Sequence, residues 1–231
     1  MAEPALSLTE VKFAWPGRGG FSLACTSFKM NPGESVLLLG SSGSGKSTLL
    51  SLICGIVPAN SGTVAVGGTD IGALTPGARD RFRAEQIGVI FQQFNLLPYA
   101  SVADNILMPL RFAPKRHSRA GDAGKEATRL CAVLGLPNDA LKRPAGRLSV
   151  GQQQRVAVAR ALIGAPPLIV ADEPTSALDG ATQDMFLQLL FDQVAAVGSS
   201  LLMVSHDERL SDRFDRVAHV EEFVSTEGVS A

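Results

Sequence analysis

Three short apolar runs constrain the fold of this chain more than any other feature of its sequence. They cover residues 36–39, 168–171 and 201–204, and none of them alternates apolar with polar residues. Strands that are buried on both faces of a parallel sheet have this pattern, whereas strands with one exposed face alternate. The sequence therefore predicts an α/β fold with a mainly parallel sheet.

Polar residues follow each of these runs directly. The first run leads into Gly-Ser-Ser-Gly-Ser-Gly-Lys-Ser at 40–47, the second into Asp172 and Glu173, and the third into Ser205 and His206. In open α/β sheets, ligands bind beyond the carboxyl ends of the parallel strands. We therefore expect the three polar clusters to converge on one site.

Residues 40–47 match the pattern G-x-x-x-x-G-K-[ST], with a predicted strand before them and a helical pattern at 47–53 after them. Glycines in this motif let backbone N–H groups surround a phosphate, the lysine neutralises phosphate charge, and the hydroxyl after it binds Mg²⁺. The segment predicts a P-loop that holds the phosphates of a nucleotide. Its candidate binding residues are Gly40, Ser41, Ser42, Gly43, Ser44, Gly45, Lys46, Ser47 and Thr48, with Ser47 as a metal ligand.

The adjacent carboxylates of Asp172 and Glu173 suit two different tasks. An acid at the end of a buried strand can bind Mg²⁺, and a second one can take a proton from an attacking water. This pair therefore predicts hydrolysis, with Asp172 on the metal and Glu173 as the base. The alternative is a polar strand end that leads into a turn at Pro174.

The rest of the chain predicts two additions to the parallel core. Residues 62–68 read as a short strand between turn residues, which indicates an antiparallel accessory sheet. Residues 96–148 have a helical pattern that five prolines interrupt, which indicates several short helices. We expect one domain over 1–231, with its core at 1–91 and 158–231 and a helical subdomain at 92–157. The basic run 115–119 carries no interleaved aromatics and is interpreted as a solvated loop.

Charge and composition narrow the possible partners. The chain has 21 basic and 22 acidic residues and a net charge of −1, so we expect no nucleic-acid partner. Its first ten residues lack a basic segment with an apolar run, and Pro166 and Pro167 interrupt the uncharged stretch 161–171, so we expect no direct membrane insertion. Cys25, Cys54 and Cys131 lie far apart and are predicted to be buried, which fits a reducing cytosol.

Residues 148–152 read Leu-Ser-Val-Gly-Gln, which resembles the Leu-Ser-Gly-Gly-Gln signature of the ABC transporter ATPases, with Val150 in place of the first glycine. Ser149 and Gln152 also form a capping box at the start of a helix, and capping alone remains an alternative. The resemblance implies that Ser149, Gly151 and Gln152 contact the γ-phosphate of ATP held by a second subunit. It therefore implies ATP and Mg²⁺ as cofactors, and a homodimer or heterodimer of ATPase subunits.

Four further residues match elements of this family. Gln92 resembles the Q-loop glutamine, which senses Mg²⁺ and the attacking water. Asp179, in 176–179, resembles the D-loop aspartate at the dimer interface, and His206 resembles the switch histidine that contacts the γ-phosphate. Trp15 occupies the place of the aromatic side chain that stacks on adenine. From the residues alone, a structural role for His206 and an anchoring role for Trp15 stay open.

Within the family, residues 91–98 and 143–147 are similar to those of the lipoprotein-releasing and macrolide-exporter ATPases. This resemblance implies an ATPase subunit that drives a separate transmembrane permease from the cytoplasmic face of the cell membrane. An importer ATPase, or one that powers signalling or cell-wall hydrolysis, is the alternative. Residues 220–224 depart from the family because they lack its Asp-Gly turn. The apolar residues that either line a groove for a permease helix or belong to the core are Leu96, Leu97, Tyr99 and Val102.

Overall fold

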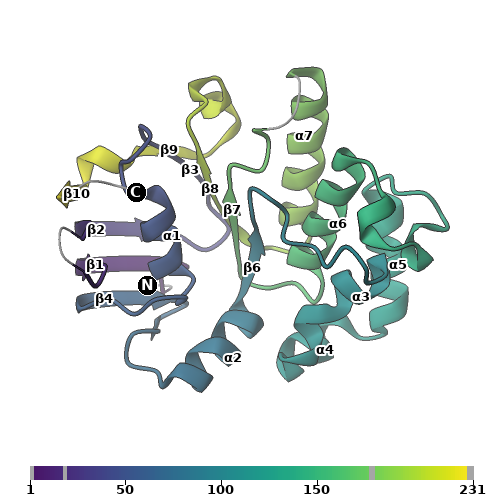
Figure 1. Ribbon diagram of the computed structural model, residues 1–231, viewed down its shortest axis with the longest axis horizontal. Coiled ribbons are helices and arrows are strands. Elements are labelled where there is room, and N and C mark those ends of the chain that lie inside the picture. The colour runs from purple at the N-terminus through teal and green to yellow at the C-terminus, as the bar shows by residue number, and fades with distance from the viewer. Residues whose placement is uncertain (1–2, 18–19, 177–179, 228–231) are drawn as a thin grey trace. The chain divides into compact units, whose positions relative to one another are not determined.

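The computed structural model describes residues 3–17, 20–176 and 180–227, which divide into two compact units (Figure 1). The first unit comprises Met1–Arg83 and Ser200–Ala231, and the second comprises Ala84–Ser199. Both contain parallel strands and helices, and the first also contains an antiparallel sheet. The predicted α/β architecture is confirmed, while the proposed limits of the helical subdomain, 92–157, stay a prediction.

The antiparallel sheet of the first unit is the accessory sheet that the glycine-rich and valine-rich segment predicted. Strand β1 alternates buried and exposed residues, with Leu6, Leu8, Val11 and Phe13 facing the core. A register shift opposite β4 occurs at the left-handed residue Glu10, whose φ is 49°. The strand order is β10 (Val224–Glu227), β2 (Ser22–Met30), β1 (Leu6–Ala14), β4 (Ser61–Val66) and β5 (Thr69–Asp70).

Two of the three predicted parallel strands lie side by side in the first unit. Strand β3 (Ser35–Leu39) pairs in parallel with β8 (Ser200–Ser205) and with β9 (Arg216–His219). Every residue of β8 is buried, as expected for a strand covered on both faces. The other elements of this unit are α1 (Lys46–Ile53), η4 (Glu208–Arg213) and η5 (Val220–Glu222), while α2 (Pro76–Gln86) begins in this unit and ends in the second.

The second unit pairs the third predicted strand, β7 (Leu168–Asp172), in parallel with β6 (Ile87–Ile90). Its helices are short where prolines interrupt the sequence, as predicted. They are α3 (Val102–Leu107), η1 (Met108–Arg111), α4 (Pro114–Ala120), α5 (Ala123–Val133), η2 (Ala140–Lys142), η3 (Ala145–Arg147), α6 (Val150–Leu162) and α7 (Gly180–Ala196).

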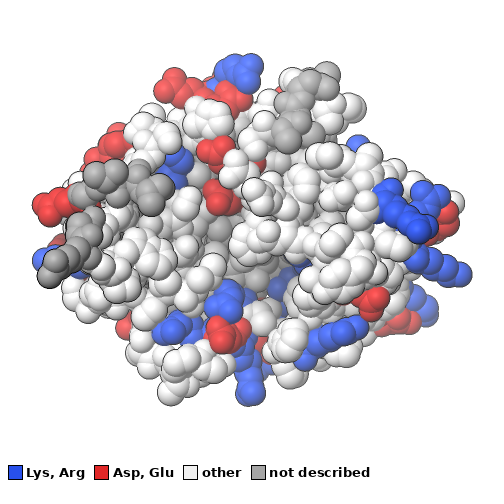
Figure 2. Space-filling view, viewed as in Figure 1, with Lys and Arg blue, Asp and Glu red and all other residues white. Residues whose placement is uncertain are grey.

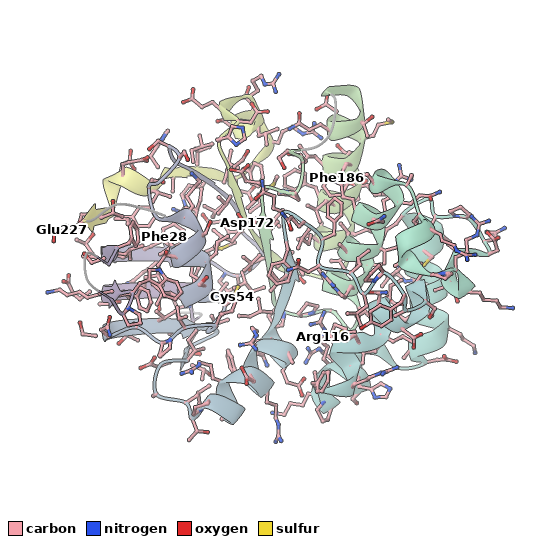
Figure 3. All side chains as sticks on the ribbon, viewed as in Figure 1. Phe28, Cys54, Arg116, Asp172, Phe186 and Glu227 are labelled. Carbon is pink, nitrogen blue, oxygen red and sulfur yellow. The ribbon has the colours of Figure 1, made fainter. Side chains whose placement is uncertain are left out.

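The interpretation of the basic run 115–119 as a loop is wrong, and its predicted exposure to solvent holds for every residue of the run except Arg116. These residues belong to α4, which carries the Arg116 labelled in Figure 3. Arg116 is only 1% exposed. Burial of a guanidinium requires hydrogen-bond acceptors for its N–H groups, and here backbone carbonyls of α2, β6 and the end of α6 supply them. No local pattern in the sequence distinguishes such an arginine from an exposed one.

The cysteines are buried, as predicted, and burial raises the pKa of the Cys25 and Cys131 thiols to about 11. Among the described residues, no helix has both the length and the apolarity that a membrane span requires. Figure 2 shows basic and acidic residues on one face of the molecule, where residues of opposite charge lie beside one another in several small groups.

Candidate functional site

The predicted P-loop connects β3 to α1 in the first unit. Gly45 precedes α1 with a φ of 90°, a left-handed conformation that glycine adopts without steric cost. A Cβ atom at this position would also lie 3.0 Å from Leu23 Cδ1 and 3.1 Å from Thr226 Cγ2. The backbone conformation and the close packing both explain why the loop carries glycine immediately before its lysine.

Lys46 folds back across the loop that it follows. Its ammonium donates to the carbonyl oxygens of Gly40 and Ser41, both at 2.7 Å. Because an ammonium has three N–H donors, these two bonds fix the position of the charge and leave one donor for a further acceptor. The lysine is thus held as a positive charge at the mouth of the loop.

Two further features of the loop fit a bound phosphate chain. The first hydrogen bond of α1 runs from Leu49 N to Gly45 O at 2.8 Å, so the amides of the first turn have no partner within the helix. Among the described residues, the Ser44 hydroxyl is buried and has no hydrogen-bond partner. Phosphate oxygens would supply acceptors for all of these donors. The loop therefore fits the predicted nucleotide, although its individual contacts stay predictions.

Trp15 lies next to the first turn of α1. Its indole Nε1 donates to Thr48 Oγ1 at 3.3 Å, and its ring packs edge-on against Phe13 with centroids 5.0 Å apart. The side chain is still 42% exposed. This position beside the P-loop suits a ring that stacks on a base, and the contacts with Phe13 and Thr48 equally serve an anchoring role.

His206 emerges at the same sheet edge as the P-loop. In the register of β3 and β8, Leu39 lies opposite Ser205, so Gly40 and His206 are the next residues along two adjacent strands. His206 is exposed, and Ser205 Oγ accepts a hydrogen bond from Asp207 N at 3.0 Å. Two of the three polar clusters that the sequence placed at strand ends therefore meet in the first unit.

A carboxylate that the sequence analysis missed also contacts the P-loop. Glu221 Oε1 accepts from Ser41 N at 2.8 Å and from Ser41 Oγ at 2.9 Å, and the bond from the Ser41 amide lowers the pKa of Glu221. Glu221 follows β9, whose last residue, His219, lies opposite Leu39. The only available signal was the unusual segment 220–224, which lacks the family's Asp-Gly turn.

In the second unit, Gln92 and the two acidic residues leave a common sheet edge. Ile90 lies opposite Ala171 in the β6 and β7 pair, so Gln92 follows one strand while Asp172 ends the other. Gln92 is exposed, and Asp172 and Glu173 are partly buried. Glu173 has a φ of 41°, a strained conformation for a residue other than glycine that is typical of functional sites.

The signature segment forms the N-terminus of α6. Gln152 N donates to Ser149 Oγ at 3.3 Å, and Ser149 N donates to Gln152 Oε1 at 3.1 Å, which is the predicted capping box. Val150 at the first helical position is 56% exposed. Asp179 lies outside the described residues, so its predicted role at a dimer interface stays a prediction.

Gly151 has no evident structural reason to be glycine within this chain. A Cβ atom added there would meet nothing within 4 Å among the described residues. Alanine in a helix is more stable than glycine by about 1 kcal/mol, so the position gives up helix stability. A requirement from outside the chain, such as close approach of a ligand or a second subunit, would explain the residue.

Helix α6 also holds two functional segments through side chains that the sequence analysis missed. Gln154 is 2% exposed, and its amide donates to the carbonyl of Pro174, next to Glu173. Arg160 donates to the carbonyls of Phe94 and Asn95, each at 2.6 Å, just after Gln92. Burial lowers the pKa of Arg160. Neither side chain matches a short motif, because both partners are distant in sequence.

A parallel α/β core with this P-loop defines the chain as a P-loop NTPase. A model of the ABC transporter family matches residues 23–176, and the chain belongs to that family. It is an ATP-hydrolysing member, an ABC ATPase, as the signature segment indicated.

Several known proteins are similar over most of the chain. The lipoprotein-releasing system ATP-binding protein LolD of Novosphingobium aromaticivorans is 38% identical over 227 residues, which cover 97% of this chain and 99% of LolD. The macrolide export ATP-binding/permease protein MacB of Rhodopirellula baltica is 39% identical over 197 residues, which cover 85% of this chain and 28% of MacB. The expected resemblance to these two groups is confirmed.

A solved structure supports the same assignment. It is the dimeric, post-hydrolysis state of the ATP-binding cassette MJ0796 bound to ADP and Pi. The two chains are 30% identical with a TM-score of 0.78, and the match covers 98% of this chain and 99% of the cassette.

Proposed function

We propose that this chain is the nucleotide-binding subunit of an ABC transporter, that it dimerises head to tail around two Mg-ATP, and that it drives a separate transmembrane permease of the lipoprotein-release or macrolide-efflux type. The subunit would then work in the cytoplasm, held at the inner face of the cell membrane by its permease. Similarity to LolD and MacB supports the transport type, and similarity to a dimeric cassette supports the dimer.

The N-terminus of α6 is the observation that carries the proposed dimer. It presents backbone N–H groups at a capped helix start, which is a ready anion-binding surface. Gly151 leaves that surface open, because it has no Cβ atom. Among the described residues, no atom beyond its chain neighbours and the helix's own backbone lies within 4 Å of the place where a Cβ would be. A γ-phosphate held by the partner subunit's P-loop is the anion that fits this position in the proposed dimer.

In the proposed mechanism, each residue acts on one part of the reaction. Lys46 and the loop amides hold the β- and γ-phosphates and neutralise the charge that develops during transfer. Glu173 accepts a proton as water attacks, while Gln92 and His206 orient the water and the γ-phosphate. Asp179 would contribute from the dimer interface, and Trp15 would stack on the adenine. Removal of the base alone would slow hydrolysis by about 10²- to 10⁴-fold.

The donors proposed for the metal are all oxygen atoms, which suits Mg²⁺. They are the Ser47 hydroxyl, the Asp172 carboxylate and the Gln92 amide oxygen, and Mg²⁺ prefers such hard ligands together with phosphate oxygens and water. When bound, Mg²⁺ would neutralise charge on the β- and γ-phosphates. Ser47 lies in the first turn of α1, and Asp172 is the last residue of the buried strand β7. The backbone therefore limits where these donors can move.

The predicted docking surface for the permease divides into two parts in the structure. Tyr99 is 80% exposed, and Leu96 and Leu97 are partly exposed. Val102, by contrast, is fully buried at the first position of α3 and belongs to the core. An exposed aromatic next to two partly exposed leucines suits the apolar side of a short helix from the permease.

Copurification tests this proposal, with Tyr99→Asp as the test variant and Val102→Asp as the matched control for unfolding. We expect Tyr99→Asp to keep its melting temperature and its ATPase activity as an isolated subunit. It should lose copurification with a membrane protein and the stimulation of turnover by that protein. Val102→Asp should lower the melting temperature, because it places a charge in the core. If Tyr99→Asp copurifies with its permease as the wild type does, the docking surface lies elsewhere.

A further inference from the structure

The Arg160 side chain connects the last turn of α6 to the turn at residues 91–95, which contains Gln92. Arg160 is only 9% exposed, and the two terminal nitrogens of its guanidinium donate to two consecutive carbonyls, those of Asn95 and Phe94, at 2.6 Å each. A guanidinium has the planar fork geometry that two neighbouring acceptors require, and a lysine does not. The contact therefore fixes both the position and the orientation of this turn.

The turn itself has an unfavourable backbone conformation. Phe94 has a φ of 57° and Asn95 a φ of 46°, so two consecutive residues other than glycine are left-handed. Asparagine tolerates this region, but for a bulky residue such as phenylalanine it is an outlier that surrounding contacts must enforce. The local bonds from Phe94 N to Phe91 O and from Asn95 N to Gln93 O lie within the turn itself. Arg160 is the contact from a distant element that aligns its carbonyls.

The segment after the turn is held by α3 and by the residues just before α6. Asn105 is fully buried, and its side chain accepts from Leu97 N at 2.8 Å and donates to Leu97 O at 3.1 Å. The carbonyls of Pro98 and Ala100 accept from the amides of Gly146 and Ala145, both at 2.9 Å. These amides lie just before Ser149. Residues 94–100 are thus bonded close to both ends of the signature helix.

We propose that Arg160 is a positioning residue for Gln92, because it enforces the left-handed turn at Phe94 and makes the position of Gln92 follow the signature helix α6. The segment that carries the exposed Tyr99 and the N-terminus of α6 would then move together. This inference rests on the roles that the proposed function gives to Gln92 and to the signature segment.

The first test replaces Arg160 with methionine, which has a similar length and no donors, and follows amide hydrogen exchange of 92–97 in the nucleotide-free protein. We expect faster exchange at these amides and a kcat for ATP hydrolysis that is lower by about 10- to 100-fold, because small misplacements of reacting groups have effects of this size. The KM for ATP should change by less than about twofold, because the P-loop lies on other elements. Arg160→Lys should resemble Arg160→Met in hydrogen exchange and in kcat, since lysine lacks the planar fork of the guanidinium.

A rescue experiment separates positioning from general stabilisation. Phe94→Gly and Phe94→Ala both remove the aromatic ring, but only glycine adopts the left-handed conformation without cost. In the Arg160→Met background, the glycine variant should exceed the alanine variant in protection of 92–97 and in kcat by about 5- to 30-fold. Equal values for the two double variants, or unchanged exchange in Arg160→Met, would overturn the proposal. Faster amide exchange in Arg160→Met with an unchanged kcat would show that Arg160 holds the turn. The same result would refute the proposal that this contact positions Gln92 for hydrolysis.

Discussion

The buried guanidinium of Arg116 gives a prediction about stability that follows directly from its contacts. The side chain donates to five backbone carbonyls at 2.6 to 3.2 Å, and three of them belong to the end of α6. Those three carbonyls are among the last of the helix, which lack intrahelical partners. Burial and the nearby Arg119 lower the pKa of Arg116 to about 9, so the side chain stays charged at neutral pH. The five acceptors are Ala84, Ile87, Arg160, Ala161 and Ile163.

Replacement of Arg116 by methionine keeps the length of the side chain and removes every donor. Each buried carbonyl left without a partner costs about 1 to 3 kcal/mol, while relief of the buried charge offsets part of the total. Breaking a buried charge network of this kind typically costs about 3 to 5 kcal/mol, against a total stability of about 5 to 15 kcal/mol. For a chain of 231 residues, that loss corresponds to a melting temperature lower by about 6 to 20 °C.

Thermal unfolding monitored by circular dichroism or calorimetry measures this shift. Arg119→Met is the matched control, because Arg119 lies one turn along the same helix and donates to Gly164 O and Glu85 O, but is exposed. The control should lose about 1 kcal/mol or less. A melting temperature for Arg116→Met within about 2 °C of the wild type would show that the five carbonyls do not depend on the guanidinium.

Two further predictions concern the loops of the catalytic site. Glu173→Gln should bind ATP, hydrolyse it about 10²- to 10⁴-fold more slowly and accumulate as a dimer, and size-exclusion chromatography with Mg-ATP that shows only monomer at full turnover would contradict this. The amide of Ser41 holds the pKa of Glu221 below its usual 4.5, so this carboxylate stabilises the fold above about pH 4.5 and loses the effect as pH falls through its lowered pKa. Glu221→Gln should therefore melt below the wild type at pH 7, and the difference should vanish in acid; a difference that persists unchanged at low pH would assign it to shape, not charge.

The elements that carry the nucleotide could be predicted because their signals are local. Apolar runs without alternation identified β3, β7 and β8, and a glycine-rich segment before a helical pattern identified the P-loop and α1. The capping box at Ser149 also depends on residues three positions apart. Each of these patterns lies within a few residues, so the sequence alone contains the physical cause.

The residues that hold these segments together could not be predicted in the same way. Arg116 lies in a basic run whose composition favours solvent exposure, and its acceptors are 29 to 47 positions away. Arg160 reaches Phe94 across 66 positions, and Glu221 reaches Ser41 across 180. Such contacts depend on which surfaces the fold brings together, and a single sequence carries no local mark of them. The exposure of a residue also depends on distant contacts. Tyr99 and Val102 lie three positions apart in the same segment, yet Tyr99 is 80% exposed and Val102 is fully buried.

Subunit mixing tests most directly whether each ATP is hydrolysed between the P-loop of one subunit and the signature helix of another. Lys46→Ala disables the P-loop and Ser149→Arg disables the α6 N-terminus, so neither variant alone should hydrolyse ATP at an appreciable rate. An equimolar mixture should form mixed dimers in which one of the two sites has both an intact Lys46 and an intact Ser149. Random pairing of independent sites predicts about one quarter of wild-type activity in the mixture. A mixture as inactive as both parents at every ratio would contradict a head-to-tail dimer.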